Sequence, residues 1–115
     1  MTPFGRRLRE LRAERGQKLM EMAAALKVTP AYLSALEHGH RGKPSGGLVQ
    51  QISAWFNLAW DDVDELTRLA QLSNPRVVID TSGLSPEATE LANRLAERIA
   101  KLDATAIAAL GRGLE

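Results

Sequence analysis

The chain has 115 residues, of which 44% are hydrophobic and 4% aromatic, and it contains no cysteine. This composition leaves room for one compact domain with an appendage, and it excludes a disulfide framework and a thiolate metal site. The net charge of +1 hides an asymmetry. Residues 1–45 hold nine Lys and Arg against four Asp and Glu, whereas residues 46–115 hold six against ten. A basic first half suggests a surface that faces a polyanion.

The chain shows no segment suited to a membrane or to secretion. No run of about eighteen apolar residues occurs, and the N-terminal MTPFGRRLRE has no apolar stretch behind its charges. We therefore expect a cytoplasmic protein without a membrane partner.

Five helices are predicted in the first 72 residues. Thr2-Pro3 and Thr29-Pro30 each place a capping hydroxyl before a proline that is tolerated at the first helical position. Apolar residues then recur at helical spacing, as in Phe4, Leu8 and Leu11. The expected helices cover approximately residues 3–15, 18–27, 30–38, 46–56 and 60–72.

Residues 73–84, SNPRVVIDTSGL, predict a linker because Pro75 and Gly83 interrupt helix, and residues 77–79 could be extended. Ser85-Pro86 then predicts a last helix that runs to about residue 102, with another turn or two up to residue 110. Residues 85–115 would form a C-terminal helical segment. Its stripe would join two chains or fold back on its own domain, and we expect dimerisation through Leu91, Leu95, Ile99 and Leu102.

The stretch from Leu19 to Pro44, LMEMAAALKVTPAYLSALEHGHRGKP, is the most informative part of the chain. It predicts a short helix, a tight turn, and a second helix that begins at a capped Thr-Pro. This is the helix-turn-helix layout, in which the second helix can enter a DNA major groove.

Residues 4–66 resemble the Cro and phage-repressor type of helix-turn-helix domain, also called the XRE family. The resemblance is carried by residues spread over four elements: Leu8, Leu11, Arg12, Gly16, Met22, Ala23, Leu26, Val28, Leu33, Leu36, Glu37, Gly39 and Pro44. It implies an all-α fold, with a five-helix repressor-like domain over residues 1–72 followed by a helical extension. It also implies a structural ion pair between Arg12 and Glu37.

The resemblance assigns base-reading positions to Pro30, Ala31, Ser34 and Ala35, with Thr29 as cap and phosphate contact. Three of these four side chains cannot form hydrogen bonds, so they can only touch a thymine methyl or allow close approach. The polar residues expected to contact DNA around them are Tyr32, His38, His40, Arg41 and Lys43.

The start of the second helix departs from the family pattern. The usual Thr cap and Gln clamp are replaced by Lys18 and Leu19, of which only Lys18 can reach a phosphate. His38 and His40 are spaced like a metal pair, but no carboxylate or cysteine lies close to them in sequence. We expect no metal, no cofactor and no enzyme activity, because no phosphate loop, catalytic triad or zinc spacing occurs.

These features predict a sequence-specific DNA-binding transcriptional regulator. The expected form is a homodimeric repressor that reads a near-palindromic operator in double-stranded DNA through the helix at 30–38. One alternative is an antitoxin-type regulator, whose C-terminal segment would bind a toxin or another protein partner. The other is a protein-interaction module that kept the fold without DNA readout.

Overall fold

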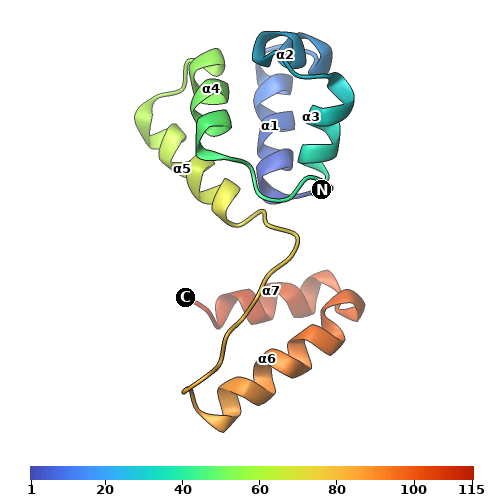
Figure 1. Cartoon of the computed structure of the whole chain (residues 1–115), viewed down its shortest axis with the longest axis vertical. Coiled ribbons are helices and arrows are strands. Elements are labelled where there is room, and N and C mark those ends of the chain that lie inside the picture. Colours follow the sequence, from blue (N-terminus) through green and yellow to red (C-terminus); the bar gives the residue numbers. More distant parts are fainter. The chain divides into compact units, whose positions relative to one another are not determined.

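The computed structural model describes residues 1–115, which form seven α-helices, one short 3-10 helix and no strand. The all-α fold class predicted from the sequence is therefore confirmed. The elements are α1 (Pro3–Glu14), α2 (Leu19–Leu26), α3 (Pro30–Glu37), α4 (Gly46–Phe56), α5 (Trp60–Gln71), α6 (Pro86–Arg98), η1 (Ile99–Lys101) and α7 (Ala104–Arg112) (Figure 1).

The chain divides into two compact units. Unit 1 is Met1–Val77 and contains α1 to α5, whereas unit 2 is Val78–Glu115 and contains α6, η1 and α7. None of the helices combines the length and the apolar character needed to cross a membrane.

Helices α1 and α4 of unit 1 begin at side-chain caps, of which the Thr2 cap was predicted. The Thr2 hydroxyl accepts a hydrogen bond from the Gly5 N–H at 3.0 Å, and Ser45 accepts one from Leu48 N–H at 3.2 Å. Each bond satisfies a backbone donor that has no partner inside its helix. Gly16 and Asn57, which follow α1 and α4, both have positive φ, as is common where a helix ends.

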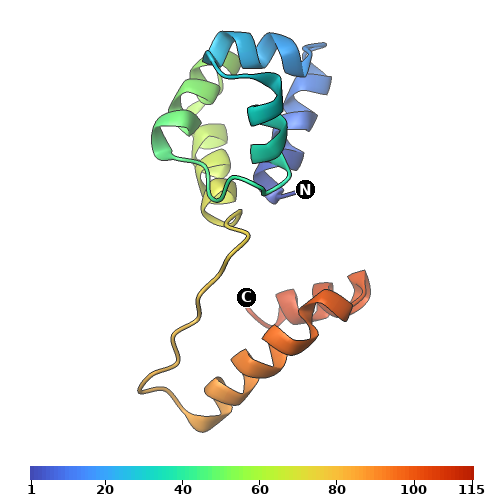
Figure 2. The ribbon, with the colours of Figure 1, turned by 45° about the vertical axis from the view of Figure 1, so that its right-hand side comes forward.

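The core of unit 1 lies among all five helices. Helix α1 packs against α3 and α5, while α2 packs against α3 and α4, and α4 against α5 (Figures 1 and 2). The buried apolar side chains are Phe4, Leu8, Leu11, Met22, Ala23, Leu33, Leu36, Val49, Ile52, Phe56, Leu66 and Ala70. Each helix contributes at least two of them, so the core holds α2 and α3 in a fixed relation.

The N-terminus of α1 is joined closely to the C-terminus of α3. Both the backbone N–H and the hydroxyl of Thr2 donate to the Glu37 carbonyl, at 3.0 and 3.1 Å. A Cβ at Gly5 would lie 2.1 Å from the same carbonyl oxygen. Only glycine therefore lets α1 approach α3 this closely.

Unit 1 continues beyond the last turn of α5. The buried Ser73 hydroxyl accepts a hydrogen bond from Phe4 N–H at 2.9 Å and donates to the Leu69 carbonyl. This serine therefore connects the end of α5 to the start of α1. The stretch 77–79 is exposed and contains no strand.

Unit 2 differs from the single helix predicted up to residue 102. Helix α6 ends at Arg98 and tightens into η1, after which Leu102 is extended with ψ 138°. Asp103 then starts α7, and its carboxylate accepts a hydrogen bond from Ala106 N–H at 2.8 Å. The prediction missed this cap because the apolar spacing continues across the break.

Candidate nucleic-acid interface

The turn between α2 and α3 sets the direction in which α3 begins. Lys27 takes the left-handed conformation with φ 58°, and the Val28 N–H then donates to the Ala23 carbonyl at 3.0 Å. The Thr29 hydroxyl caps α3 by accepting from Tyr32 N–H at 3.0 Å. The turn, residues 27–29, is tight because it supplies partners for a carbonyl near the end of α2 and for a backbone N–H at the start of α3.

Helix α3 has a buried face and an outward face. Leu33, Leu36 and Glu37 are buried, which fixes the rotation of the helix about its axis. The outward face follows from this rotation: Pro30, Ala31, Tyr32 and His38 are exposed, while Ser34 and Ala35 are partly buried.

A buried ion pair holds α3 to α1. The Arg12 guanidinium forms hydrogen bonds with both carboxylate oxygens of Glu37, one of them at 3.2 Å, and the side chains are only 8% and 3% exposed. Arg12 also lies 3.4 Å from the sulfur of Met22 in α2. The ion pair thus links α1, α2 and α3. Because both residues are buried, its role is to hold the helices together.

The loop after α3 folds back along the helix that it leaves. Gly39 has φ 82°, and the His40 N–H donates to the Ala35 carbonyl at 2.9 Å. The His38 ring nitrogen Nδ1 lies 2.8 Å from the Ser34 carbonyl oxygen, and the two histidine rings stack with centroids 6.4 Å apart. The loop side chains are therefore held beside the outward face of α3.

Tyr32 positions one of the loop cations. The Arg41 guanidinium lies over the Tyr32 ring, 5.5 Å from its centroid, which is within the range of a cation–π contact. Tyr32 itself is 37% exposed. Arg41 is thus held beside α3 while it remains exposed.

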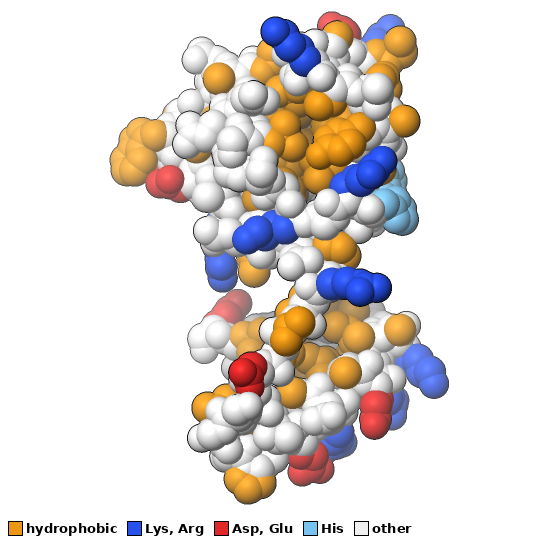
Figure 3. All heavy atoms as spheres, in the orientation of Figure 1, with side chains coloured by type: hydrophobic (Ala, Val, Ile, Leu, Met, Phe, Trp, Pro, Cys, Tyr) orange, Lys and Arg blue, Asp and Glu red, His pale blue; other side chains and the backbone are white.

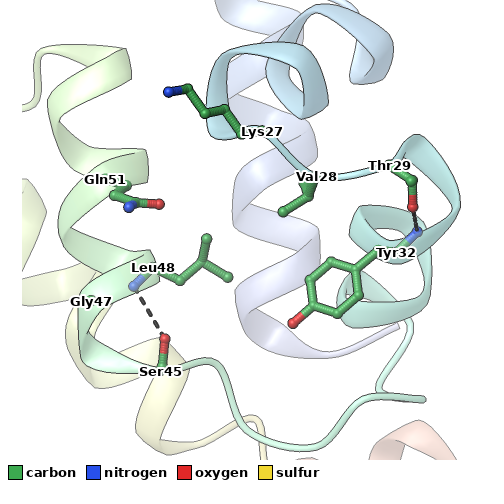
Figure 4. A pocket seen from close by; sticks show the side chains of 8 residues that line it. All are labelled: Lys27, Val28, Thr29, Tyr32, Ser45, Gly47, Leu48 and Gln51. Atoms are coloured by element: carbon green, nitrogen blue, oxygen red, sulfur yellow. Dashed lines mark hydrogen bonds between the residues drawn. The ribbon is translucent and has the colours of Figure 1, made fainter.

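An open groove of about 840 Å³ lies between the turn and the start of α4. Figure 4 shows the Tyr32 hydroxyl and the Val28 and Leu48 side chains pointing into it. The groove is lined by Lys27, Val28, Thr29 and Tyr32 on one side and by Ser45, Gly47, Leu48 and Gln51 on the other. Of these residues the sequence predicted only Thr29 and Tyr32 as DNA contacts, because the two sides of the groove meet only through the packing of α4 beside the turn.

The cations around α3 have no acidic partner. Lys18, Lys27, Arg41 and Lys43 are exposed, and none of them forms an ion pair. By contrast, Arg7 on α1 contacts Glu10, Glu14 and Glu65. Figure 3 shows hydrophobic side chains on this face of unit 1 with lysine, arginine and histidine around them. Positive charge without a protein partner suits an anionic ligand.

Arg7 has a different role from these free cations. Desolvation lowers its pKa, but the hydrogen bond to Glu10 and the charges of Glu14 and Glu65 outweigh this and raise the pKa above its ordinary value. Arg7 is thereby held in ion pairs that link α1 to α5.

No group of three or more His, Cys, Asp or Glu side chains is arranged to hold a metal ion.

Comparisons with known proteins find similarity over unit 1. A family model described as "Helix-turn-helix domain" matches residues 3–77. The chain is 30% identical over 63 residues to the uncharacterized HTH-type transcriptional regulator RghRB of Bacillus subtilis, a match that covers 55% of this chain and 45% of that protein. It is 41% identical over 59 residues to the HTH-type transcriptional regulator DdrOP3 of Deinococcus deserti, which covers 51% and 45%. The matches thus span just under half of each relative's length. No solved structure matches the chain.

Proposed function

We propose that this chain, which belongs to the helix-turn-helix domain family, is a DNA-binding transcriptional regulator. The observation that carries the proposal is the outward face of α3, which lies beside a loop whose cations have no acidic partner. In helix-turn-helix proteins the second helix of the motif enters the major groove. The names of the two relatives support the same role.

Contacts to the phosphate backbone of the DNA would come from the lysine and arginine side chains around α3. Arg41 and Lys43 would bind phosphates from the loop behind the helix, and Lys18 would bind one from the start of α2. Thr29, His38 and His40 would add polar contacts to the DNA backbone. Because such contacts carry no sequence information, they would set the register of α3 on the duplex.

Base readout would come from a short, mostly apolar surface. Pro30, Ala31 and Ala35 would contact thymine methyl groups, and Ser34 would donate or accept one hydrogen bond. Tyr32 would act mainly by holding Arg41 in place. Such a surface predicts an operator whose major-groove floor is rich in thymine.

We assign the chain to the Cro and phage-repressor type within the broader family, on the pattern of residues over α1 to α4. We further propose that it acts as a homodimeric repressor on a near-palindromic site, with Leu91, Leu95, Ile99 and Leu102 of unit 2 in the dimer contact. One helix-turn-helix domain buries too little surface for tight specific binding, and a two-fold pair doubles it.

A second candidate is a protein-interaction module that has kept this fold without reading DNA. The exposed Pro30 and Ala31 favour it, because neither side chain offers a donor or acceptor to a base edge.

Selection from a pool of random-sequence duplexes distinguishes the two candidates. A regulator of the proposed kind enriches two half-sites in inverted orientation, with centres about one helical turn, or roughly 34 Å, apart. An interaction module enriches no sequence. Enrichment of a single half-site would support sequence-specific DNA binding but contradict binding as a dimer.

A further inference from the structure

The chain contains two histidines, His38 and His40, and both are exposed at the end of α3. Figure 3 shows histidine side chains on the surface of unit 1, with lysine or arginine close by. The two rings stack on each other, with centroids 6.4 Å apart. A histidine side chain ordinarily gains or loses its charge between about pH 5 and 8, whereas lysine and arginine stay charged there. These two rings can therefore change the charge of this surface near neutral pH.

The ring of His38 is held in one orientation by the backbone of α3. Its Nδ1 lies 2.8 Å from the Ser34 carbonyl oxygen, which also accepts a hydrogen bond from the His38 backbone N–H at 3.1 Å. A carbonyl oxygen can only accept, so Nδ1 must carry the proton of the neutral ring. The other nitrogen, Nε2, then has only a lone pair until a second proton binds to it.

The ring of His40 is not fixed in this way. The His40 backbone N–H donates to the Ala35 carbonyl at 2.9 Å, but neither of its ring nitrogens forms a hydrogen bond. A neutral His40 ring can therefore carry its proton on either nitrogen and donate it to a ligand. The two histidines thus differ in one respect, because the tautomer of His38 is fixed and that of His40 is free.

No free carboxylate surrounds His38. The elements around it are α1 and α2, the loop after α3, and residues 72–77, in which the Pro75 Cβ lies 3.7 Å from the Cβ position at Gly39. All four carboxylates of α1 to α3 already have a partner: Glu10, Glu14, Glu21 and Glu37. The groups at the start of α1, in the loop and in residues 72–77 are positive or can become so: the Met1 amine, Arg6, His40, Arg41, Lys43 and Arg76. The free protein therefore offers no negative charge that would hold a second proton on His38.

We infer that His38 contacts a DNA phosphate only in its protonated form, so that each chain takes up a proton from solvent when it binds DNA. This role rests on the proposed function, in which the end of α3 and the loop after it meet the phosphate backbone. A phosphate oxygen accepts hydrogen bonds but cannot donate one, so it would face the lone pair of a neutral Nε2. A second proton turns Nε2 into a charged donor, whose hydrogen bond to phosphate is charge-assisted.

The pH dependence of DNA binding by the full chain tests this role. The affinity for a mixed-sequence duplex is measured by fluorescence anisotropy from about pH 8 to about pH 6 at one low salt concentration. Because the complex holds more protons than the separate molecules, binding should strengthen as the pH falls, by up to roughly tenfold per pH unit for each His38 that meets a phosphate. Binding that does not change with pH would overturn the role of His38 and leave DNA binding intact. No binding at any pH would instead contradict the proposed function.

Two matched variants show which histidine takes up the proton. His38→Gln can donate to a phosphate but cannot change its charge, so the pH dependence should disappear. His40→Gln should keep the wild-type pH dependence, whatever its affinity, because a neutral His40 ring can already donate. A pH dependence that survives in His38→Gln, or that is lost in His40→Gln, would overturn the assignment to His38.

The tautomer of His38 is checked without DNA, by nitrogen-15 NMR of the imidazole rings in the full chain at about pH 8. His38 should carry its proton on Nδ1, and His40 should show both tautomers. A neutral His38 ring with its proton on Nε2 would overturn the inference, because that ring could donate to a phosphate without taking up a proton.

Discussion

At the scale of single residues, the two sets of arginines and lysines in unit 1 have separate tasks. Arg7 and Arg12 are engaged by carboxylates and hold helices together. Arg41 and Lys43 face solvent with no acidic partner. Composition alone cannot separate these sets, because both contribute equally to the positive charge of the first half.

Replacing Arg41 and Lys43 together with Ala should weaken binding to specific and nonspecific duplexes alike. Each lost phosphate contact should reduce the slope of log K against log salt by roughly 0.9, since fewer counterions are released. The slope is measured by fluorescence anisotropy over a salt series. Arg68→Ala on α5 is the control and should leave the slope unchanged. An unchanged slope in the double variant would remove both residues from the interface.

Replacing Glu37 with Ala should destabilise the protein by about 3–5 kcal/mol, because it leaves the buried Arg12 guanidinium unpaired. Removing both charges, as in Arg12→Met with Glu37→Leu, should cost less than the single change. Urea unfolding followed by circular dichroism measures both. A cost below about 1 kcal/mol for Glu37→Ala would mean that the pair behaves like an exposed one.

At the scale of elements, the close approach of α1 to the end of α3 depends on one glycine. Gly5→Ala should destabilise unit 1 by about 1–3 kcal/mol or more, because its Cβ would meet the Glu37 carbonyl, and backbone cannot rotate away. Gly47→Ala in α4 is the matched control. No atom lies within 4 Å of its Cβ position, so it should stabilise the helix by about 0.5–1 kcal/mol. In thermal unfolding, Gly5→Ala should therefore lower the melting temperature and Gly47→Ala should raise it. Changes of the same sign in the two variants would contradict this packing.

The elements of unit 1 were largely predictable, because caps and stops are local signals. Thr2 and Thr29 start their helices as predicted, and so does Ser85 in unit 2, since a hydroxyl before proline needs only its own backbone. The break at Leu102 was not predicted, because Asp103 caps α7 without interrupting the apolar spacing. Local signals therefore describe helix starts better than they describe a tight reversal between two helices of similar pattern.

The candidate site was predictable only in part, for a different reason. The outward residues of α3 follow from helical spacing once Leu33 and Leu36 are placed in the core. The groove that joins Lys27 to Gln51 depends on how α4 packs beside the turn, which is a tertiary contact. The stacking of Arg41 on Tyr32 likewise depends on the path of the loop.

At the scale of the whole molecule, the two units contribute differently to stability and to binding. A chain truncated after Asp80 keeps all of unit 1, including Ser73, and should unfold near the wild-type temperature. It should sediment as a monomer and bind DNA weakly, because it contacts one half-site instead of two. Sedimentation velocity and anisotropy check this. If the truncated chain remains dimeric, the dimer contact lies in unit 1.

Binding of the selected duplex by the wild-type chain and by Ala35→Glu tests most directly whether α3 reads DNA. Ala35 lies on the outward face of α3, and its side chain is partly buried. A carboxylate at this position would therefore meet the floor of the major groove and the phosphates. The wild-type chain should prefer the selected duplex over a scrambled one, while Ala35→Glu should lose binding and keep its helical circular dichroism. Ala54→Glu on the exposed side of α4 should change neither property. Equal binding by wild type and Ala35→Glu, or no preference of the wild type for the selected duplex, would contradict DNA reading by α3.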